Sequence, residues 1–440
     1  MFARIIALFL LSTFAATAWA TPKIQHWQSA SGAQVYFVED HDLPMLDVAV
    51  NFPAGSGFDA ADKPGVAELA NGMLDLGTEA LSEDEVGRRM ADIGAQYSNF
   101  ADPDRAGMSV RTLSSARERD AALAVLAQML QHPVFPESVL QREKARVIAA
   151  LQEAATRPES IAAKAFGKAV FGTHPYGEYA EVADIEKIQR SDLEAFYRAH
   201  YGARSAVVAL MGDITRAQAE AIAQQLTASL PPGGGATQIA PVQMSIQPSE
   251  QRIAHPASQS HILIGAPGIA RNDPDYFPLY VGNYILGGGG FVSRLMNEIR
   301  EKRGLAYSVY SYFMPMQQAG AFQIGLQTKK EQADEALRLA RETLREFVEK
   351  GVTPAELQAA KDNIVNGFPL RIDSNRKILE YLSVIGFYGL PLTYLDDFVA
   401  RVNAVTVAQV NGAFKRRVHP EAMATIMVGA PEMTGNGSAK

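Results

Sequence analysis

The chain has 440 residues and a formal net charge of −7 at pH 7, with 47% hydrophobic and 20% charged residues. This length is too great for one small core and predicts about two or three domains, with the composition of an ordinary folded chain. No basic stripe stands out along the sequence, which argues against a nucleic-acid partner. The chain contains no cysteine, which excludes disulfides, thiolate catalysis and cysteine-ligated zinc.

Residues 1–20 have the features of a secretion signal peptide. Arg4 precedes a short apolar run, and Ala18 and Ala20 supply the small residues of a cleavage site. The run is short for a membrane span, and no later segment reaches the roughly 18 apolar residues that a span requires. We therefore expect a periplasmic mature chain that starts at Thr21 and has no membrane span.

The first half of the mature chain is expected to combine short strands with longer amphipathic helices. Alternating apolar residues and turn-prone flanks predict strands over 34–39, 46–52, 97–100, 107–113 and 206–211. Helical periodicity predicts helices over 65–76, 82–93, 115–131, 138–155, 159–170 and 191–200. A capping box of Ser82 and Glu85 marks the start of the second of these helices.

The segment 231–235, Pro-Pro-Gly-Gly-Gly, is the clearest linker, and the order of elements recurs after it. Strands are expected over 261–264 and 422–428, and helices over 276–286, 331–349, 354–368 and 406–417. An offset of 217 residues pairs apolar positions of the two halves, such as Leu193 with Val410, and an offset of 211 pairs Leu69 with Tyr280. These matches indicate a duplication.

The predicted fold class is α+β, with two homologous lobes that form a clamshell. Each lobe is expected to be an α/β sandwich of a mainly antiparallel sheet with helices. The predicted domains are 21–230 and 241–440, joined by a linker over 231–240. A cleft between two such lobes is a common place for a ligand.

The most informative segment runs from Gly287 to Tyr310. Its four glycines, at 287, 288, 289 and 290, are expected to open a helix that carries Arg300 near its end, and Tyr307 is expected to begin the next strand. This arrangement would place a guanidinium and a phenol at the edge of one cleft. The glycine run is not a P-loop, because no Gly-Lys-Ser/Thr follows it. It is either a turn at the start of a helix that needs positive φ or a loop that a peptide backbone can approach.

At these residues the chain resembles the M16 family of zinc peptidases, which includes pitrilysin, insulin-degrading enzyme and mitochondrial processing peptidase. It is most similar to the bacterial half-size members, and the resemblance covers nearly all of the mature chain. In the C-terminal half, the matching segments are 286–289, 293–295 and 298–307. In the N-terminal half, looser matches are found at 52–57, 65, 73, 77–78 and 174–177.

The resemblance places the family's inverted zinc motif, H-x-x-E-H, on residues 68–72, where this chain has degenerate residues. Glu68 and Gly72 replace the two histidines, and Asn71 replaces the glutamate that activates the metal-bound water. The third ligand, a downstream glutamate, would fall near 149–150 and is absent. No two of the eight histidines have a ligand spacing. We therefore expect no metal cofactor in this chain.

The resemblance also implies a role for Arg300 and Tyr307. In the family, an Arg and a Tyr seven positions later hold the substrate backbone and stabilise the tetrahedral intermediate, and both are present here with that spacing. A guanidinium fork and a phenol donor suit that chemistry. Spacing alone leaves open that Arg300 forms a surface ion pair and that Tyr307 is a packing residue. The family's Gly-rich segment implies substrate contacts for the four glycines.

These expectations combine in one functional hypothesis. The chain is a subunit of a periplasmic heterodimeric M16 metalloendopeptidase, inactive alone, that contributes Arg300 and Tyr307 to peptide binding and oxyanion stabilisation. A paralogue supplies the zinc and the H-x-x-E-H motif, and a homodimer is the arrangement expected in its absence. One alternative is a non-catalytic peptide-binding or scaffold protein. The other is an independent zinc peptidase with altered ligands.

Overall fold

The structure is a computed structural model that describes residues 23–245 and 247–429. The expected signal peptide, residues 1–20, lies outside the described residues, as do the last residues of the expected C-terminal domain. Within the described part, no helix has the length and apolar character that crossing a bilayer would require.

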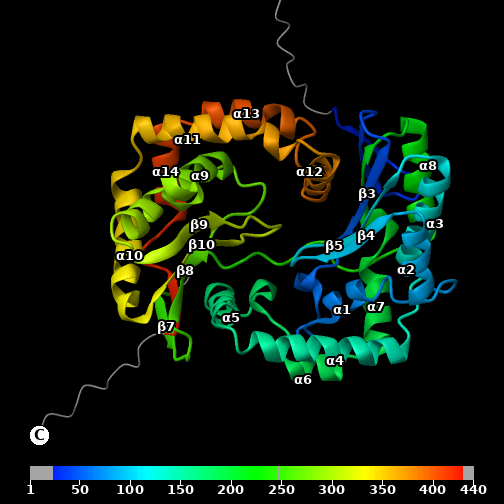
Figure 1. The fold of residues 1–440 in the computed structure, drawn as a ribbon, viewed down its shortest axis with the longest axis horizontal. Coiled ribbons are helices and arrows are strands. Elements are labelled where there is room, and N and C mark those ends of the chain that lie inside the picture. The colour runs from blue at the N-terminus through cyan, green and yellow to red at the C-terminus, as the bar shows by residue number, and fades with distance from the viewer. Residues whose placement is uncertain (1–22, 246, 430–440) are drawn as a thin grey trace, which may run out of the picture.

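The described residues form two lobes, each built on one mixed sheet (Figure 1). The N-terminal sheet has the strand order β1-β2-β6-β3-β5-β4, and the C-terminal sheet has the order β7-β11-β8-β10-β9. Most neighbouring strands are antiparallel, whereas β2 with β6 and β7 with β11 are parallel. The strands β4 and β9 therefore each have one edge without a partner strand among the described residues.

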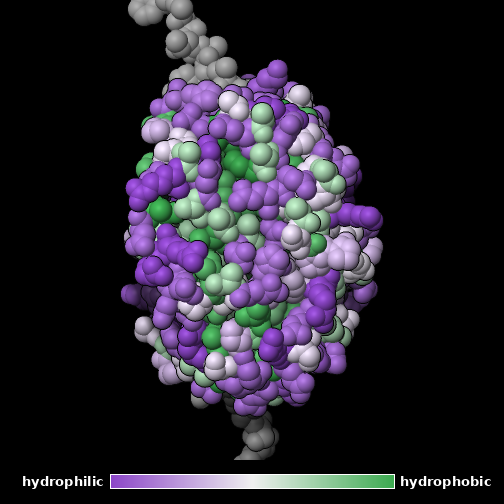
Figure 2. Space-filling model, turned by 90° about the vertical axis from the view of Figure 1, so that its right-hand side faces the viewer, coloured by the Kyte–Doolittle hydropathy of each residue, from purple (hydrophilic) through white to green (hydrophobic). Residues whose placement is uncertain are grey.

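The strands of the N-terminal lobe are β1 (Gln25–Gln28), β2 (Gln34–Glu39), β3 (Met45–Phe52), β4 (Gln96–Ala101), β5 (Ala106–Leu113) and β6 (Val207–Gly212). Its helices are α1 (Val66–Gly72), α2 (Glu83–Asp92), α3 (Ala116–Gln131), α4 (Glu137–Ala154), α5 (Pro158–Phe171), α6 (Val182–Lys187), α7 (Arg190–His200) and α8 (Arg216–Thr227). Figure 2 shows the face at the right-hand side of Figure 1, which is mostly hydrophilic with hydrophobic residues between the polar ones.

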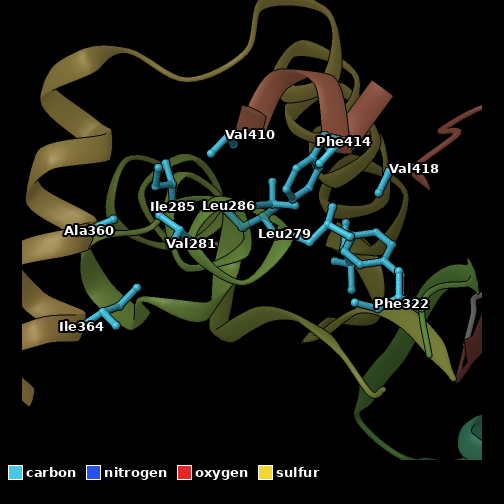
Figure 3. Packing of buried hydrophobic residues seen from close by; sticks show 14 of the residues in the cluster. Leu279, Val281, Ile285, Leu286, Phe322, Ala360, Ile364, Val410, Phe414 and Val418 are labelled. Atoms are coloured by element: carbon cyan, nitrogen blue, oxygen red, sulfur yellow. The ribbon is translucent and has the colours of Figure 1, made fainter. Parts of the chain in front are cut away.

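The strands of the C-terminal lobe are β7 (Ser249–Ile253), β8 (Gln259–Pro267), β9 (Ala306–Phe313), β10 (Ala321–Lys329) and β11 (Ala424–Val428). Its α-helices are α9 (Tyr276–Asn283), α10 (Ala333–Lys350), α11 (Pro354–Gly367), α12 (Asn375–Phe387), α13 (Tyr394–Ala404) and α14 (Val407–Arg417). Leu279 on α9, Phe322 on β10 and Phe414 on α14 belong to the buried core that joins these helices to the sheet (Figure 3).

The duplication predicted from the sequence is confirmed by the positions of the helices. Helices α3, α4, α5 and α7 begin 217 residues before α10, α11, α12 and α14, in that order. The sequence-based elements also match well, although β1, β7, α6, α8, α12 and α13 were not predicted. The predicted two-lobed α+β fold is therefore correct.

Each lobe contributes one helix that packs on the sheet of the other lobe. Helix α5 packs on β8 and β11 of the C-terminal sheet, and α12 packs on β6 and β3 of the N-terminal sheet. The contacts are tight, because a Cβ added at Gly386 on α12 would lie 2.5 Å from Val207 and 2.7 Å from Tyr36. On the other side, a Cβ added at Gly265 would lie 2.7 Å from the Phe166 ring of α5. This exchange holds the two lobes together through buried apolar surface.

A buried carboxylate adds a polar connection between the lobes. Asp104, in the turn between β4 and β5, is fully buried and accepts hydrogen bonds from the Tyr176 and Tyr388 hydroxyls and from the Gln317 backbone N–H. The Gln318 N–H donates in turn to the Tyr176 hydroxyl at 3.1 Å. Burial raises the pKa of Asp104, and these hydrogen bonds only partly offset that effect. We call these five residues the interlobe node.

The helix predicted after the glycine run is present over residues 294–301, but its hydrogen bonding and that of the glycine run are irregular. A π-helical turn over Tyr284–Gly288 continues α9, a 3₁₀ turn covers Gly290–Val292, and a second π-helical turn covers Met296–Glu301. Close packing requires glycine at position 287, because a Cβ there would lie 2.5 Å from the backbone nitrogen of Ser311 on β9. Of the four glycines, only Gly290 has positive φ, at 60°.

Candidate functional site

Helix α1 carries the residues that replace the zinc motif. The N-terminus of α1 is held by the Asp59 carboxylate, which accepts hydrogen bonds of 2.8 Å from the backbone N–H groups of Gly65 and Ala67. Burial raises the pKa of Asp59 to about 6 despite these hydrogen bonds. On the helix, Glu68 is exposed, whereas Asn71 is only 3% exposed. The two positions therefore face different surroundings.

The Asn71 side chain is part of a buried hydrogen-bond network. Its amide donates to the Gly107 carbonyl at 3.1 Å and to the Tyr201 hydroxyl at 3.2 Å. Its backbone carbonyl accepts from the Asn99 amide at 2.7 Å, and Asn99 also donates to Asp75 at 2.8 Å. Asn71 thus connects α1 to β5 and α7. An amide with these roles takes no proton from a substrate water, and its place is structural.

A cavity of about 460 Å³ lies beside these residues. It is lined by residues of the N-terminal lobe, among them Glu68, Asn71, Asn99, Glu143 and Arg146. Neither Arg300 nor Tyr307 contributes to its lining. The cavity thus joins the degenerate motif to other residues of the N-terminal lobe and does not include the Arg–Tyr pair.

Sequence reasoning missed Glu143, a carboxylate on α4 that lines the same cavity. It precedes the expected third-ligand position by about two helical turns. Burial disfavours its charged form, yet hydrogen bonds from Arg146 at 2.6 Å and Arg142 at 3.1 Å lower the pKa of Glu143 overall. Its oxygens are thus occupied by guanidinium groups. The only signal in the sequence was a carboxylate flanked by two arginines on a helix, which is also typical of a surface ion pair.

The residues at the degenerate motif do not fit a zinc ion. Gly72 has no side chain, the Asn71 amide is directed at Gly107 and Tyr201, and Glu143 is paired with two arginines. Zinc requires about four nitrogen, sulfur or oxygen ligands in tetrahedral order, and Glu68 supplies one carboxylate. Among the described residues, no group of three or more histidine, aspartate or glutamate side chains could hold a metal.

The other candidate residues lie between the glycine run and β9. Three arginines follow the glycines, and two of them are fully engaged. Arg294 donates to both oxygens of Glu356 at 2.7 and 2.8 Å and holds the pKa of that carboxyl at about 2. Arg303 donates to the carbonyl and carboxylate oxygens of Glu298 at 2.7 and 2.9 Å. These two arginines stabilise the local fold.

Arg300 differs from its two neighbours. Its nearest carboxylate oxygen, on Glu301, is 3.8 Å away, which is too long for a good hydrogen bond. Its guanidinium carbon lies 4.7 Å from the centroid of the Phe291 ring and 5.2 Å from that of Tyr307. The guanidinium is thus positioned by two aromatic rings, and it donates no hydrogen bond to any residue within 23–245 and 247–429.

Tyr307 is the second residue of β9 and is 83% exposed, and Phe291 is 66% exposed. The spacing of Arg300 and Tyr307 thus brings the two side chains together, as expected from the sequence. The half-buried packing role that spacing alone allowed for Tyr307 is contradicted by its exposure. The role of Phe291 was not foreseen, because an aromatic residue after glycines carries no signal of its contact with Arg300.

The four glycines occupy different surroundings. Gly287 is buried against Ser311, and a Cβ on Gly289 would lie 2.6 Å from the carbonyl oxygen of Tyr284. Gly288 and Gly290 are exposed, and Gly290 leads directly to Phe291. Close packing therefore explains why residues 287 and 289 are glycine, and positive φ explains why residue 290 is.

Comparisons with known proteins agree with the resemblance seen in the sequence. Residues 35–181 match the family described as Insulinase (Peptidase family M16), and residues 187–364 match the Peptidase M16 inactive domain. A solved M16 inactive domain from Pseudomonas fluorescens is 38% identical, with a TM-score of 0.89 over 93% of this chain and 98% of that chain.

Two other proteins extend this comparison. The non-peptidase homolog YmxG of Helicobacter pylori is 28% identical over 391 residues, which cover 87% of this chain and 88% of YmxG. The periplasmic protease PqqL of Escherichia coli has the same fold, with a TM-score of 0.78 and 17% identity over 94% of this chain and 46% of PqqL. Together with the sequence motifs and the two-lobed fold, these matches show that the chain belongs to the M16 peptidase family.

Proposed function

We propose that this protein is the metal-free subunit of a periplasmic M16-type zinc peptidase. In this proposal it supplies Arg300 and Tyr307, and a zinc-bearing paralogue supplies H-x-x-E-H. The observation that carries the proposal is the contrast between the two sites. The residues at the zinc-motif positions do not fit a metal, whereas the side chains of Arg300 and Tyr307 lie side by side and form no hydrogen bond with the described part of the chain.

The two-chain arrangement is supported by the separation of the two sites. The cavity beside Asn71 is lined by the N-terminal lobe without Arg300 or Tyr307. In this proposal the pair therefore faces a zinc site on another unit. PqqL has about twice the length that this chain covers, so a single chain can hold two units of this size.

The chemistry assigned to the pair follows from its exposure. The guanidinium of Arg300 can donate two hydrogen bonds to a peptide carbonyl or carboxylate. The Tyr307 hydroxyl is free to donate to the oxyanion that forms when water attacks that carbonyl. The zinc of the partner, when bound, supplies the activated water. This chain would hold the peptide and stabilise negative charge.

Reconstitution tests the proposal. The mature chain alone should contain no stoichiometric zinc and cleave no peptide, whereas a mixture with an H-x-x-E-H paralogue from the same organism should cleave peptides. In the mixture, Arg300→Ala or Tyr307→Phe should lower kcat by about 10² or more, as for other lost oxyanion donors. Arg303→Ala is the matched control, because Arg303 is paired with Glu298. Full activity of the Arg300 and Tyr307 variants in an active mixture would refute the site.

A non-catalytic peptide-binding or scaffold role is the second candidate. It is favoured by the name of the related YmxG of Helicobacter pylori, a non-peptidase homolog. It predicts peptide binding by the isolated chain and no gain in cleavage with any zinc-bearing paralogue. The two candidates are thus separated by the activity of the mixture, and a homodimer that binds peptides without cleaving them would support the second.

A further inference from the structure

A second cavity, of about 440 Å³, lies between α5 and the open side of the C-terminal sheet. Its lining comes from both lobes and is rich in large apolar and aromatic side chains. These are Phe166, Tyr179, Tyr310, Tyr312, Met314 and Met316. Cavities of this kind at the junction of two domains are typical ligand sites.

The walls of this cavity are built by aromatic rings that lie against glycines. A Cβ added at Gly325 on β10 would lie 2.5 Å from the Tyr310 ring, and one added at Gly167 on α5 would lie 2.3 Å from the Tyr179 hydroxyl. The Tyr310 and Tyr312 rings are stacked, with centroids 5.7 Å apart and an angle of 8° between their planes. The rings are therefore held in place before any ligand arrives.

Three of these large side chains remain exposed although they line a cavity. Tyr179, Tyr310 and Met314 are 38%, 39% and 47% exposed. Apolar surface that is both exposed and concave is a mark of a binding site rather than of a stable core. Burial of these side chains would stabilise the folded chain, so their exposure favours a site that an apolar ligand covers.

The charges around the cavity do not favour an ionic ligand. Of its lining residues, Glu159 carries a carboxylate but is exposed to solvent, where its field is weak. Burial lowers the pKa of His261, which favours the neutral imidazole. Burial also raises the pKa of Tyr310 and Tyr312, so both remain neutral phenols. The cavity thus offers aromatic faces and hydroxyl groups without a buried charge.

The position of the cavity connects it to the Arg300–Tyr307 pair. Ser308, Tyr310 and Tyr312 alternate along β9 and line the cavity. The pairing of β9 with β10 shifts register between Ala306 and Val309, and Tyr307 and Ser308 are both exposed there. Tyr310 is three residues from Tyr307, about 10 Å along an extended strand. The outer edge of β9 has no partner strand in the described part of the chain, although the turn after α9 covers it at Ser311, whose carbonyl accepts from the Asn283 amide at 2.9 Å. A peptide held at Tyr307 can therefore follow β9 as far as Tyr310 and reach the cavity with a side chain.

We propose that this cavity binds one aromatic side chain of an extended peptide, about three residues from the peptide group held by Arg300 and Tyr307. This inference extends the proposed function, because it names a preference of the substrate. The preference belongs to the isolated chain and needs no zinc and no partner, so it can be tested separately.

The test measures the binding of three fluorescein-labelled peptides to the isolated mature chain by fluorescence anisotropy. The peptides consist of glycine, serine and alanine and differ at one central position, which is phenylalanine, alanine or lysine. The phenylalanine peptide should bind about tenfold more tightly than the other two, as expected for burial of one large apolar side chain. Equal affinities, or a preference for lysine, would overturn the proposal.

Two tryptophan variants locate the preference. Ser308 and Ser98 are both exposed serines on the outer strands of their sheets, and only Ser308 lines this cavity. Ser308→Trp should fill the cavity and remove the preference for phenylalanine, whereas Ser98→Trp should keep it. The circular dichroism spectra and melting temperatures of both variants establish that they are folded. Persistence of the preference in a folded Ser308→Trp variant would place the aromatic side chain elsewhere.

A crosslinking measurement gives an independent readout. Benzoylphenylalanine in place of the central phenylalanine should crosslink on illumination to Met314 or Met316, identified by mass spectrometry. Crosslinks confined to other regions would refute binding in this cavity.

Arg300→Ala separates this inference from the proposed function. If both are correct, the variant weakens all three peptides by a similar factor and leaves their ratio unchanged. If the cavity binds the aromatic side chain but Arg300 does not bind the peptide, the variant changes neither the three affinities nor their ratio.

Discussion

Replacing Asp104 by alanine is expected to weaken the polar connection between the two lobes. The substitution removes the acceptor of three hydrogen bonds, from the Tyr176 and Tyr388 hydroxyls and from the Gln317 N–H at 2.7 Å. Each buried donor left without an acceptor costs about 1–3 kcal/mol. Removal of a buried charge returns part of this, since burial already raises the pKa of Asp104. We therefore expect a net loss of about 2–5 kcal/mol in the free energy of unfolding.

Urea denaturation of the mature chain, followed by circular dichroism, measures this loss. Asp104→Asn keeps one acceptor oxygen and should lose about half as much, on the order of 1–2 kcal/mol. Asp120→Ala is a suitable control, because Asp120 is 66% exposed and pairs with the neighbouring Arg119. Hydrogen exchange should also rise at residues 315–318 and 385–388 in the Asp104→Ala variant. A loss below about 1 kcal/mol, close to that of the control, would show that the interlobe node is dispensable.

Three further substitutions test local parts of the structure. Asn71→Ala should lower the free energy of unfolding by about 1–3 kcal/mol, because two buried acceptors lose their donor, and an unchanged urea midpoint would contradict this network. Asp59→Asn should remove a pH dependence of stability, because the pKa of Asp59 in the folded chain is raised to about 6. The contribution of Asp59 to stability is therefore largest at low pH and is lost as the pH rises from about 4 to 6. The difference in free energy of unfolding between wild type and variant should change over this window and be flat above it. Gly386→Ala should destabilise the chain by about 1–3 kcal/mol through its clash with Tyr36, although alanine favours helices, and a raised melting temperature would refute the tight exchange of α12.

The sequence allowed good prediction of features that depend on neighbouring residues. The capping box at Ser82 starts α2 where the sequence indicates, because both partners lie within three residues. The duplication was visible because paired helices keep a constant offset. The reason for Gly287 could not be predicted in this way, since it is a contact with Ser311 on a strand 24 residues away.

Features that depend on distant residues could not be predicted. The exchange of α5 and α12 between the sheets leaves no local pattern, because each helix is amphipathic whichever sheet it covers. For Asn71, the sequence shows that a general base is absent, while only the structure shows the hydrogen bond to Tyr201, 130 residues along the chain. Arg300 and Tyr307 could be paired from their spacing and the resemblance, but Phe291 could not be added to them.

The stability of the fold explains the identity of Asn71 at the zinc-motif position, but it does not explain Arg300 and Tyr307. Asn71 is buried, hydrogen-bonded and necessary for the packing of α1, so its identity is accounted for by the fold. Tyr307 is 83% exposed and Arg300 lacks a close carboxylate, so neither contributes much to the stability of the folded chain. The Arg300 side chain is 28% exposed and packs against the exposed Tyr307, and in our proposal a bound peptide accounts for this pair better than folding does. Of the zinc-motif positions, Asn71 is thus part of the core and Glu68 is exposed, whereas the Arg–Tyr pair is the part of the candidate site that stability does not explain.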